Sequence, residues 1–175
     1  MNSKKVIQID TRQKMNQKHH KTKEKWFLDN GYEILRSKLA FGDYAFPYNM
    51  SAVVDTKQSC SELYSNLIQQ HQRFHNECEN AQKYGIKLYV LVENKDGITR
   101  PEDIRNWKNP QMYRYWKEKR KAEKTGRKPP KPPASNVQLL KIMHSMSRDY
   151  GVEFLFCRTE DAGARIVELL GGQNG

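Results

Sequence analysis

The feature that most constrains the fold is a largely apolar run at residues 86–92, with the sequence IKLYVLV. It follows Gly85, and before that residues 61–84 carry apolar side chains at steps of three, four and seven residues. The spacing predicts a long amphipathic helix, which Ser59 or Ser61 can cap, and the run predicts a buried strand. A helix that leads through a glycine into a buried strand is typical of an α/β fold.

The remaining hydrophobic pattern extends the alternation of helices and strands along the chain. Further strands are expected at residues 6–9, 32–39, 44–46, 52–57 and 152–156, and further helices at residues 17–30, 110–123, 137–150 and 159–170. This order predicts an α/β fold with a mixed central sheet flanked by helices. A chain of 175 residues with 37% apolar residues is long enough for one core, so we expect residues 1–175 to form a single domain.

Positive charge is concentrated in two segments. The formal net charge is +11; residues 1–25 contribute +6 and residues 100–133 contribute +8, so the rest of the chain sums to −3. This distribution favours a polyanionic partner, and without a basic amphipathic helix it favours nucleic acid over a membrane surface. The alternative is a solvated basic surface that only improves solubility.

Several classes of protein are excluded by the composition. No stretch approaches the roughly 20 consecutive apolar residues of a membrane span, and the first ten residues lack the apolar core of a signal peptide. The three cysteines, Cys60, Cys78 and Cys157, are far apart and form no CxxC pair, which indicates reduced thiols rather than a disulfide framework or a zinc site. We therefore expect a cytoplasmic protein, associated with the nucleoid or, in a eukaryote, nuclear.

Residues 95–135 interrupt the alternation and are interpreted as a basic, proline-rich insertion within the domain. We expect a short helix near residues 110–123 and then an extended strap, because the paired prolines of KTGRKPPKPPA exclude a helix. Aromatic and basic side chains are interleaved in the helix, a pattern typical of binding to single-stranded or distorted nucleic acid. The predicted DNA contacts are Trp116, Lys117, Lys119, Arg120 and Lys121. In the alternative interpretation, the aromatic rings dock the insertion onto the body of the domain.

Three acidic residues stand at the ends of expected strands. Asp10 follows the first strand, Asp43 precedes the third, and Asp55 comes directly after the apolar residues of the fourth. Lys57 lies two residues after Asp55, so both side chains point to the same face of one strand. Carboxylates that converge there would form an oxygen-ligand site for Mg²⁺ or Mn²⁺, because no histidine–cysteine cluster is offered for zinc. Alternatively, Asp43 serves a Gly-Asp turn, and Asp55 and Lys57 form a surface pair.

Such a site suits the hydrolysis of a phosphodiester bond. A cation held by the carboxylates would polarise a phosphoryl oxygen and lower the pKa of a bound water. Lys57 would orient that water or stabilise the developing negative charge.

Several short motifs, in order along the chain, resemble those of the XPF/Hef-type structure-specific endonucleases. They are Ile9-Asp10-Thr11-Arg12-Gln13, Gly42-Asp43-Tyr44, Val54-Asp55-Thr56-Lys57, the helix arginine Arg73, and the strand LYVLVE at residues 88–93. The resemblance covers roughly residues 5–94 of the chain. This family belongs to the PD-(D/E)XK superfamily, so the resemblance implies a restriction-endonuclease-like core and a metal-dependent DNA endonuclease.

The resemblance also implies a role for each matching residue. Asp43 and Asp55 would hold the metal, with Asp10 and Glu62 as outer or second-metal carboxylates. Lys57 would act on the water, and the two arginines that match the family motifs would bind the scissile or an adjacent phosphate; these are Arg12 and Arg73.

The sequence departs from the family pattern at three positions. Thr56 stands where the family motif E-R-K has its arginine, and Gln13 stands where V-D-x-R-E has its acid. The trailing acid of E-R-K-x-x-x-D falls at Ser61 by strict count, so its role is assigned to Glu62, one residue on.

The resemblance implies a substrate of branched, flapped or single-strand-containing DNA, and two alternatives stay open. The first is a catalytically silent nucleic-acid-binding module on the same fold. Loss of the E-R-K arginine favours it, whereas retention of Asp43, Asp55 and Lys57 argues against it. The second is a junction resolvase that acts as a symmetric homodimer and shares the same chemistry.

Overall fold

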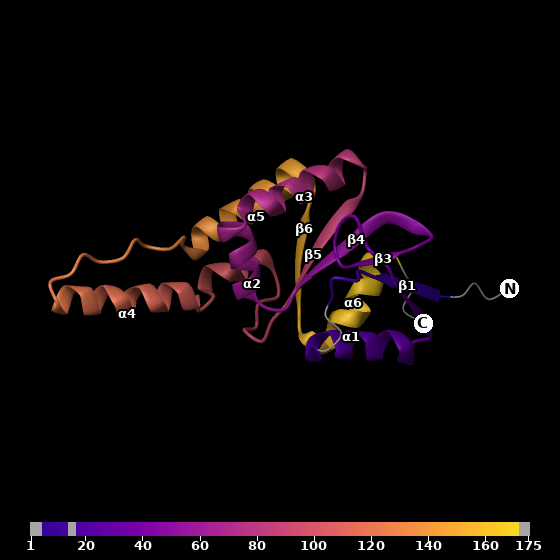
Figure 1. Ribbon diagram of the computed structural model, residues 1–175, viewed down its shortest axis with the longest axis horizontal. Coiled ribbons are helices and arrows are strands. Elements are labelled where there is room, and N and C mark those ends of the chain that lie inside the picture. The colour runs from indigo at the N-terminus through magenta and orange to yellow at the C-terminus, as the bar shows by residue number, and fades with distance from the viewer. Residues whose placement is uncertain (1–4, 14–16, 172–175) are drawn as a thin grey trace.

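The computed structural model describes residues 5–13 and 17–171, and a six-stranded sheet forms its centre (Figure 1). The strands are β1 (Lys5–Ile9), β2 (Tyr32–Arg36), β3 (Tyr44–Phe46), β4 (Asn49–Lys57), β5 (Lys87–Glu93) and β6 (Glu153–Cys157). Their order across the sheet is β2-β1-β3-β4-β5-β6. Strand β3 is antiparallel to β1 and β4, and the other neighbouring pairs are parallel, which confirms the predicted mixed sheet.

Helices cover both faces of the sheet. The α-helices are α1 (Lys18–Asp29), α2 (Cys60–Tyr64), α3 (His71–Lys83), α4 (Pro110–Lys124), α5 (Asn136–Tyr150) and α6 (Ala162–Leu169), and the short 3-10 turns are η2 (Pro101–Asn106) and η3 (Thr159–Asp161). The last predicted helix therefore begins as a 3-10 turn. No helix in the described part of the chain is long and apolar enough to cross a membrane.

The sheet separates two hydrophobic cores. Side chains of α1 and α6 form one core with the sheet, and side chains of α2, α3 and α5 form the other. Because successive residues of a strand point to opposite faces, Val53 and Val54 of β4 lie in different cores. Val90 and Leu91 of β5 divide in the same way. Strands β4 and β5 are thus packed against a core on both faces, which gives the end of β4 a rigid position.

The helix predicted over residues 61–84 is wrong as a single element. α2 gives way to a π-helical segment, η1 (Ser65–Gln69), and α3 starts only after Gln70, whose φ of −112° and ψ of 28° are not helical. The predicted apolar positions are nevertheless buried; they are Leu63, Leu67, Phe74, Cys78 and Ala81. The π segment changes the direction of the chain, and such segments occur often at functional sites. Ser59 caps α2, as one of the two predicted alternatives, because its Oγ accepts a hydrogen bond from the N–H of Glu62 at 3.2 Å.

The residues around α4 form a structure that projects from the body, which we call the arm (residues 110–133; Figure 1). It consists of α4 and an extended segment without regular secondary structure, in agreement with the helix and the strap that the sequence predicts. Asn109 caps α4 through its side chain, which accepts a hydrogen bond from the N–H of Gln111, and Pro110 occupies the first turn.

Candidate active site

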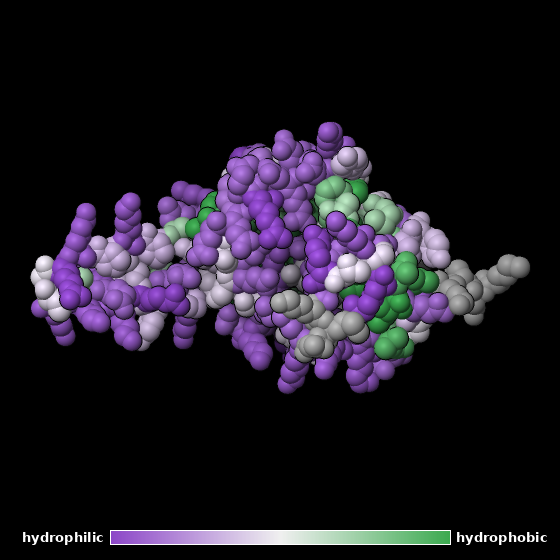
Figure 2. Space-filling model, viewed as in Figure 1, coloured by the Kyte–Doolittle hydropathy of each residue, from purple (hydrophilic) through white to green (hydrophobic). Residues whose placement is uncertain are grey.

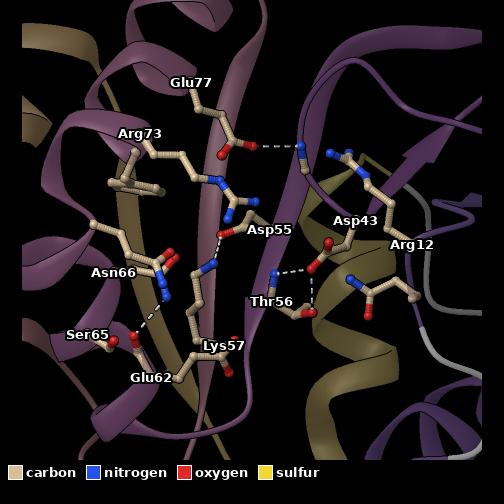
Figure 3. A pocket seen from close by; sticks show the side chains of 14 residues that line it. Arg12, Asp43, Asp55, Thr56, Lys57, Glu62, Ser65, Asn66, Arg73 and Glu77 are labelled. Carbon is tan, nitrogen blue, oxygen red and sulfur yellow. Dashed lines mark hydrogen bonds and ion pairs between the residues drawn. The ribbon is translucent and has the colours of Figure 1, made fainter.

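A cavity of about 400 Å³ opens at the carboxyl end of β4, between the sheet and the segment α2–η1–α3 (Figure 3). Its walls are formed by Arg12, Gln13, Gly42, Asp43, Asp55, Thr56, Lys57, Glu62, Ser65, Asn66, Gln70, Arg73, Phe74 and Glu77. Most of these side chains are polar or charged. We call this cavity the acidic pocket, because four carboxylates line it.

The end of β4 supplies two of the predicted residues to the acidic pocket. Asp55 and Lys57 lie on the same face of the strand, as their spacing predicts, and Lys57 Nζ is 2.7 Å from Asp55 Oδ2. The ammonium group also lies 5.9 Å from the centre of the Phe74 ring. Burial lowers the pKa of Lys57, but the Asp55 and Asp43 carboxylates outweigh it and raise the pKa overall, so Lys57 is a cation.

The loop before β3 supplies Asp43. Gly42 has a φ of +63°, and a Cβ at this position would lie 3.1 Å from the carbonyl oxygen of Val54, so only glycine fits here without strain. The Asp43 N–H donates to the same carbonyl at 2.9 Å, which ties the loop to β4. Asp43 Oδ2 accepts hydrogen bonds from the N–H and the hydroxyl of Thr56, both at 2.8 Å. Thr56, which replaces the family arginine, therefore orients the Asp43 carboxylate.

The two aspartates destabilise each other as anions. Burial and the negative charge of Asp55 together raise the pKa of Asp43 to about 7, although the Thr56 hydrogen bonds and the Lys57 charge act in the opposite direction. Among the described residues, the buried Asp55 Oδ2 has no hydrogen-bond partner apart from its ion pair with Lys57. A cation bound between the carboxylates would remove the repulsion, so the donor set fits a hard divalent metal.

The number of protein ligands also indicates which metals fit. Within the described ranges, no group of three or more histidine, cysteine or acidic side chains is close enough to hold an ion by itself. Mg²⁺ is usually bound by one or two carboxylates, with water and substrate phosphate oxygens at its other positions. Asp43 and Asp55 thus suit Mg²⁺, or the similar Mn²⁺, better than a metal that requires a complete protein cage.

Glu77 is a fourth carboxylate in the acidic pocket that the sequence reasoning missed. It lies on α3, and its Oε1 accepts a hydrogen bond from the N–H of Gly42 at 3.1 Å. Burial raises the pKa of Glu77, and the charge of Asp55 raises it further. The signal was available, because Glu77 follows Arg73 by four residues and both therefore lie on one helix face.

Glu62 and Arg73 complete the predicted set on the helical wall. Glu62 Oε2 accepts a hydrogen bond from the N–H of Gln58 at 2.8 Å, which orients the carboxylate at the start of α2. The side chain of Arg73 is exposed and points toward Asp55 in the acidic pocket (Figure 3). An arginine in this position can meet an incoming phosphate.

Asp10 is not among the residues that line the acidic pocket. It is fully buried, and its carboxylate accepts hydrogen bonds from the N–H of Leu39 and from the backbone and guanidinium of Arg12, at 2.7–3.0 Å. Burial raises the pKa of Asp10, but these bonds lower it overall, so the group is an anion held by Arg12. Arg12 itself lines the pocket. Of the residues to which the resemblance assigns a role, the structure therefore brings all into the pocket except Asp10. Asp10 instead orients Arg12.

The predicted DNA contacts of the insertion lie on α4, outside the acidic pocket. Trp116 is 47% exposed, and Lys119 Nζ lies 5.0 Å from the centre of its indole ring. Lys117, Arg120 and Lys121 are exposed. None of these residues lines the cavity.

Comparisons with known proteins agree with the motifs. The family model described as the ERCC4 domain matches residues 9–170. Two similar solved structures are XPF from Aeropyrum pernix in complex with DNA, and XPF from Aeropyrum pernix; the TM-scores are 0.58 and 0.57. Each structure is 17% identical to this chain. The match to the DNA complex covers 95% of this chain and 64% of the XPF chain, and the match to the other structure covers 94% and 63%. No curated protein matches the chain. The fold is that of the XPF nuclease domain, and the chain spans just under two thirds of the length of those structures.

Proposed function

The chain belongs to the ERCC4 domain family, and from this premise we propose that it is a metal-dependent DNA endonuclease that hydrolyses phosphodiester bonds. The observation that carries the proposal is the meeting of Asp43, Asp55 and Lys57 at the end of β4 in one polar cavity. Metal-dependent hydrolysis of a phosphodiester needs carboxylates that hold the metal ion and a positive charge that stabilises the reacting phosphate. Asp43 and Asp55 would supply the first, and Lys57 would supply the second. The alternative of a silent module is less well supported, because every group needed for the reaction faces the cavity.

Each residue has a role that follows from its position. Asp43 and Asp55 would hold Mg²⁺ or Mn²⁺, which polarises a phosphoryl oxygen and lowers the pKa of a coordinated water. The Lys57 ammonium, held by Asp55, would stabilise the negative charge that develops on the phosphate. Arg73 would bind the phosphate from the helical wall.

The remaining acidic and basic groups would support this arrangement. Arg12, oriented by Asp10, would bind an adjacent phosphate from the other side of the acidic pocket. Glu62 would act through water as an outer carboxylate, and Glu77 would add negative charge that attracts the cation.

For the substrate we propose DNA that is branched, flapped or partly single-stranded. Support comes from the net charge of +11 and from the similar XPF structure, which is described as a complex with DNA. A homodimeric junction resolvase would share the chemistry of the acidic pocket and would differ only in the substrate that it prefers.

The test is a cleavage assay with labelled flap, fork, junction and linear DNAs, in Mg²⁺, in Mn²⁺ and in EDTA. We expect cleavage with either metal and none in EDTA, and we expect Asp55→Asn to abolish cleavage while DNA binding persists, because an amide is a poor ligand for a hard cation. Asp29→Asn, at an exposed position on α1, is the matched control and should cleave normally. Cleavage at an unchanged rate in EDTA, or by Asp55→Asn, would overturn the proposal.

A further inference from the structure

The arm carries its positive charge on one side. Six residues of α4 are exposed and, at 100° per residue, fall within about 120° of the helix circumference; they are Tyr113, Arg114, Lys117, Arg120, Lys121 and Lys124. We call this set the basic stripe. The two acids of the helix, Glu118 and Glu123, lie outside this arc. Lys119 also lies outside it, on the side where Tyr115 and Ala122 are less exposed.

Within the described residues, the charges of the basic stripe have no counterions. The arm has nine basic and two acidic residues, a net charge of +7. In the part of the chain that the structure describes, no ion pair involves a cation of the arm. On the face that Figure 2 shows, the arm is a mostly hydrophilic projection. Its surface therefore suits a polyanion.

The base of the arm is fixed to the wall of the acidic pocket. Asn136 accepts a hydrogen bond from Asn109 Nδ2 at 3.0 Å and donates to the carbonyl oxygen of Trp107 at 2.7 Å, so the two ends of the arm are joined. The Tyr64 hydroxyl donates to the carbonyl oxygen of Ala134 at 3.0 Å. The rings of Tyr64 and Trp107 are 6.3 Å apart, and Trp107 is buried.

Tyr64 connects the arm to the site of cleavage. It belongs to α2, the helix that also places Glu62 in the acidic pocket two residues earlier. The arm is therefore attached to one wall of the pocket by hydrogen bonds and a buried tryptophan, and not by a flexible linker. DNA bound along the arm would therefore lie at a fixed position relative to the pocket.

We propose that the arm binds the sugar–phosphate backbone of DNA through the basic stripe and holds the substrate on one side of the acidic pocket. This inference rests on the proposed function for the identity of the polyanion. The five cations of the basic stripe can each contact a phosphate, and Tyr113, which is 72% exposed, is placed to stack on an unpaired base.

The test is a binding experiment that needs no catalysis. The variant Lys117→Gln/Lys121→Gln is compared with Lys83→Gln/Lys141→Gln, which removes the same charge from exposed positions on α3 and α5. Fluorescence anisotropy with labelled duplex and flap DNA, in EDTA and from about 50 to about 200 mM salt, gives the slope of log affinity against log salt. We expect the arm variant to lose about 1.8 from the slope on duplex, since each lost phosphate contact removes about 0.9. The control variant should keep the wild-type slope.

The two proposals fail in different ways. If the arm variant keeps the wild-type slope and affinity, the inference is wrong, whatever the cleavage assay shows. The same holds if the control variant loses as much slope as the arm variant, because the effect is then one of net charge. If Asp55→Asn still cleaves, the proposed function is wrong, and the anisotropy experiment still decides whether the arm binds DNA. All four substituted lysines are exposed, so each double variant should melt at the wild-type temperature, which would confirm that its folding is unchanged.

Discussion

Lys57 and Asp55 form an ion pair inside the acidic pocket, with 2.7 Å between Nζ and Oδ2, although each residue is more than nine-tenths buried. Removing two charges from water is costly, and their attraction offsets that cost only when the geometry is good. Loss of one partner leaves the other as an unpaired buried charge. The pair thus keeps the lysine charged and beside the proposed metal ligands, which a surface lysine could not do with the same precision.

The first prediction concerns this lysine. Lys57→Met should lower the rate of cleavage about 100-fold or more, because a charge aimed at the developing anion is lost. Calorimetric titration with Mg²⁺ should still detect binding, since Asp43 and Asp55 remain. Lys57→Arg keeps the charge and serves as the control, with partial activity. An unchanged rate in Lys57→Met would assign the residue to structure alone.

Glu77 gives a second prediction, because it has two separable roles. Its charge would attract the metal ion, whereas its hydrogen bond holds the loop at Gly42. Glu77→Gln retains an acceptor for the Gly42 N–H and removes the repulsion with Asp55. Without metal, we expect the melting temperature of Glu77→Gln to equal or exceed that of the wild type. Adding Mg²⁺ should raise the melting temperature of the variant by less than it raises that of the wild type. Glu79→Gln, exposed on the same helix, should behave like the wild type. A larger stabilisation by Mg²⁺ in Glu77→Gln would contradict this role.

A third prediction tests a buried ion pair away from the acidic pocket. Lys23 of α1 and Glu93 of β5 contact each other, and both are essentially inaccessible to solvent. Lys23→Met should lower the free energy of unfolding by about 3–5 kcal/mol, since Glu93 is left unpaired. The double variant Lys23→Met/Glu93→Leu should be more stable than Lys23→Met. Urea unfolding measures the free energy of unfolding of Lys23→Met, of Glu93→Leu and of the double variant. If the loss in the double variant equals the sum of the losses in the two single variants, the ion pair does not couple the two residues.

His20 predicts how stability depends on pH. Burial lowers its pKa to about 4, and the nearby charges of His19, Lys23 and Arg36 contribute. The unfolded chain binds a proton at His20 near pH 6.5, whereas the folded protein binds it only near pH 4, so stability is lost as the pH falls through this window.

The corresponding measurement is urea unfolding of the wild type and His20→Gln at several pH values. The wild type should lose on the order of 2 kcal/mol more than the variant between about pH 6.5 and about pH 4. His144→Gln, at an exposed position on α5, is the control and should follow the wild type. Parallel curves for wild type and His20→Gln would show that His20 is not responsible.

Stacking on the arm is the last prediction. Tyr113→Ala and Trp116→Ala should each weaken binding to single-stranded or flapped DNA more than to duplex, by about 1–3 kcal/mol for a ring that stacks on a base. Anisotropy on the two kinds of DNA measures the difference. An equal loss on both, together with a lower melting temperature, would mean that the ring only holds the arm in place.

Much of the site could be predicted because a strand has a period of two. Asp55 and Lys57 share a face for that reason alone, and the buried residues around them fix which face it is. Asp43 was predicted from its place before the third strand and from the Gly42-Asp43-Tyr44 motif, and the structure shows that Gly42 permits the turn that brings the loop against β4. These relations are local, so the sequence is sufficient to state them.

The errors arose where the same pattern is compatible with two structures. Asp10 directly follows β1, whereas Asp55 lies among the last residues of β4; β3 separates the two strands in the sheet, and the Asp10 carboxylate is bound by Arg12. The apolar steps from Leu63 to Ala81 suit a continuous helix and an interrupted one equally well, because the same apolar side chains are buried despite the π segment. Glu77 was missed although its spacing of four residues from Arg73 places both side chains on one helix face.

The hydrogen bond between Asn109 and Asn136 has a consequence for engineering. It places the points where the chain leaves and re-enters the body side by side, so the arm between them (residues 110–133) forms a cassette. Exposed loops whose ends are adjacent tolerate shortening, lengthening and replacement, because little of the remaining chain must move. On the two proposals above, cleavage by the acidic pocket and DNA binding by the arm would be separable functions. A different insert between the same two asparagines would leave the acidic pocket unchanged and would change the substrate that is held beside it.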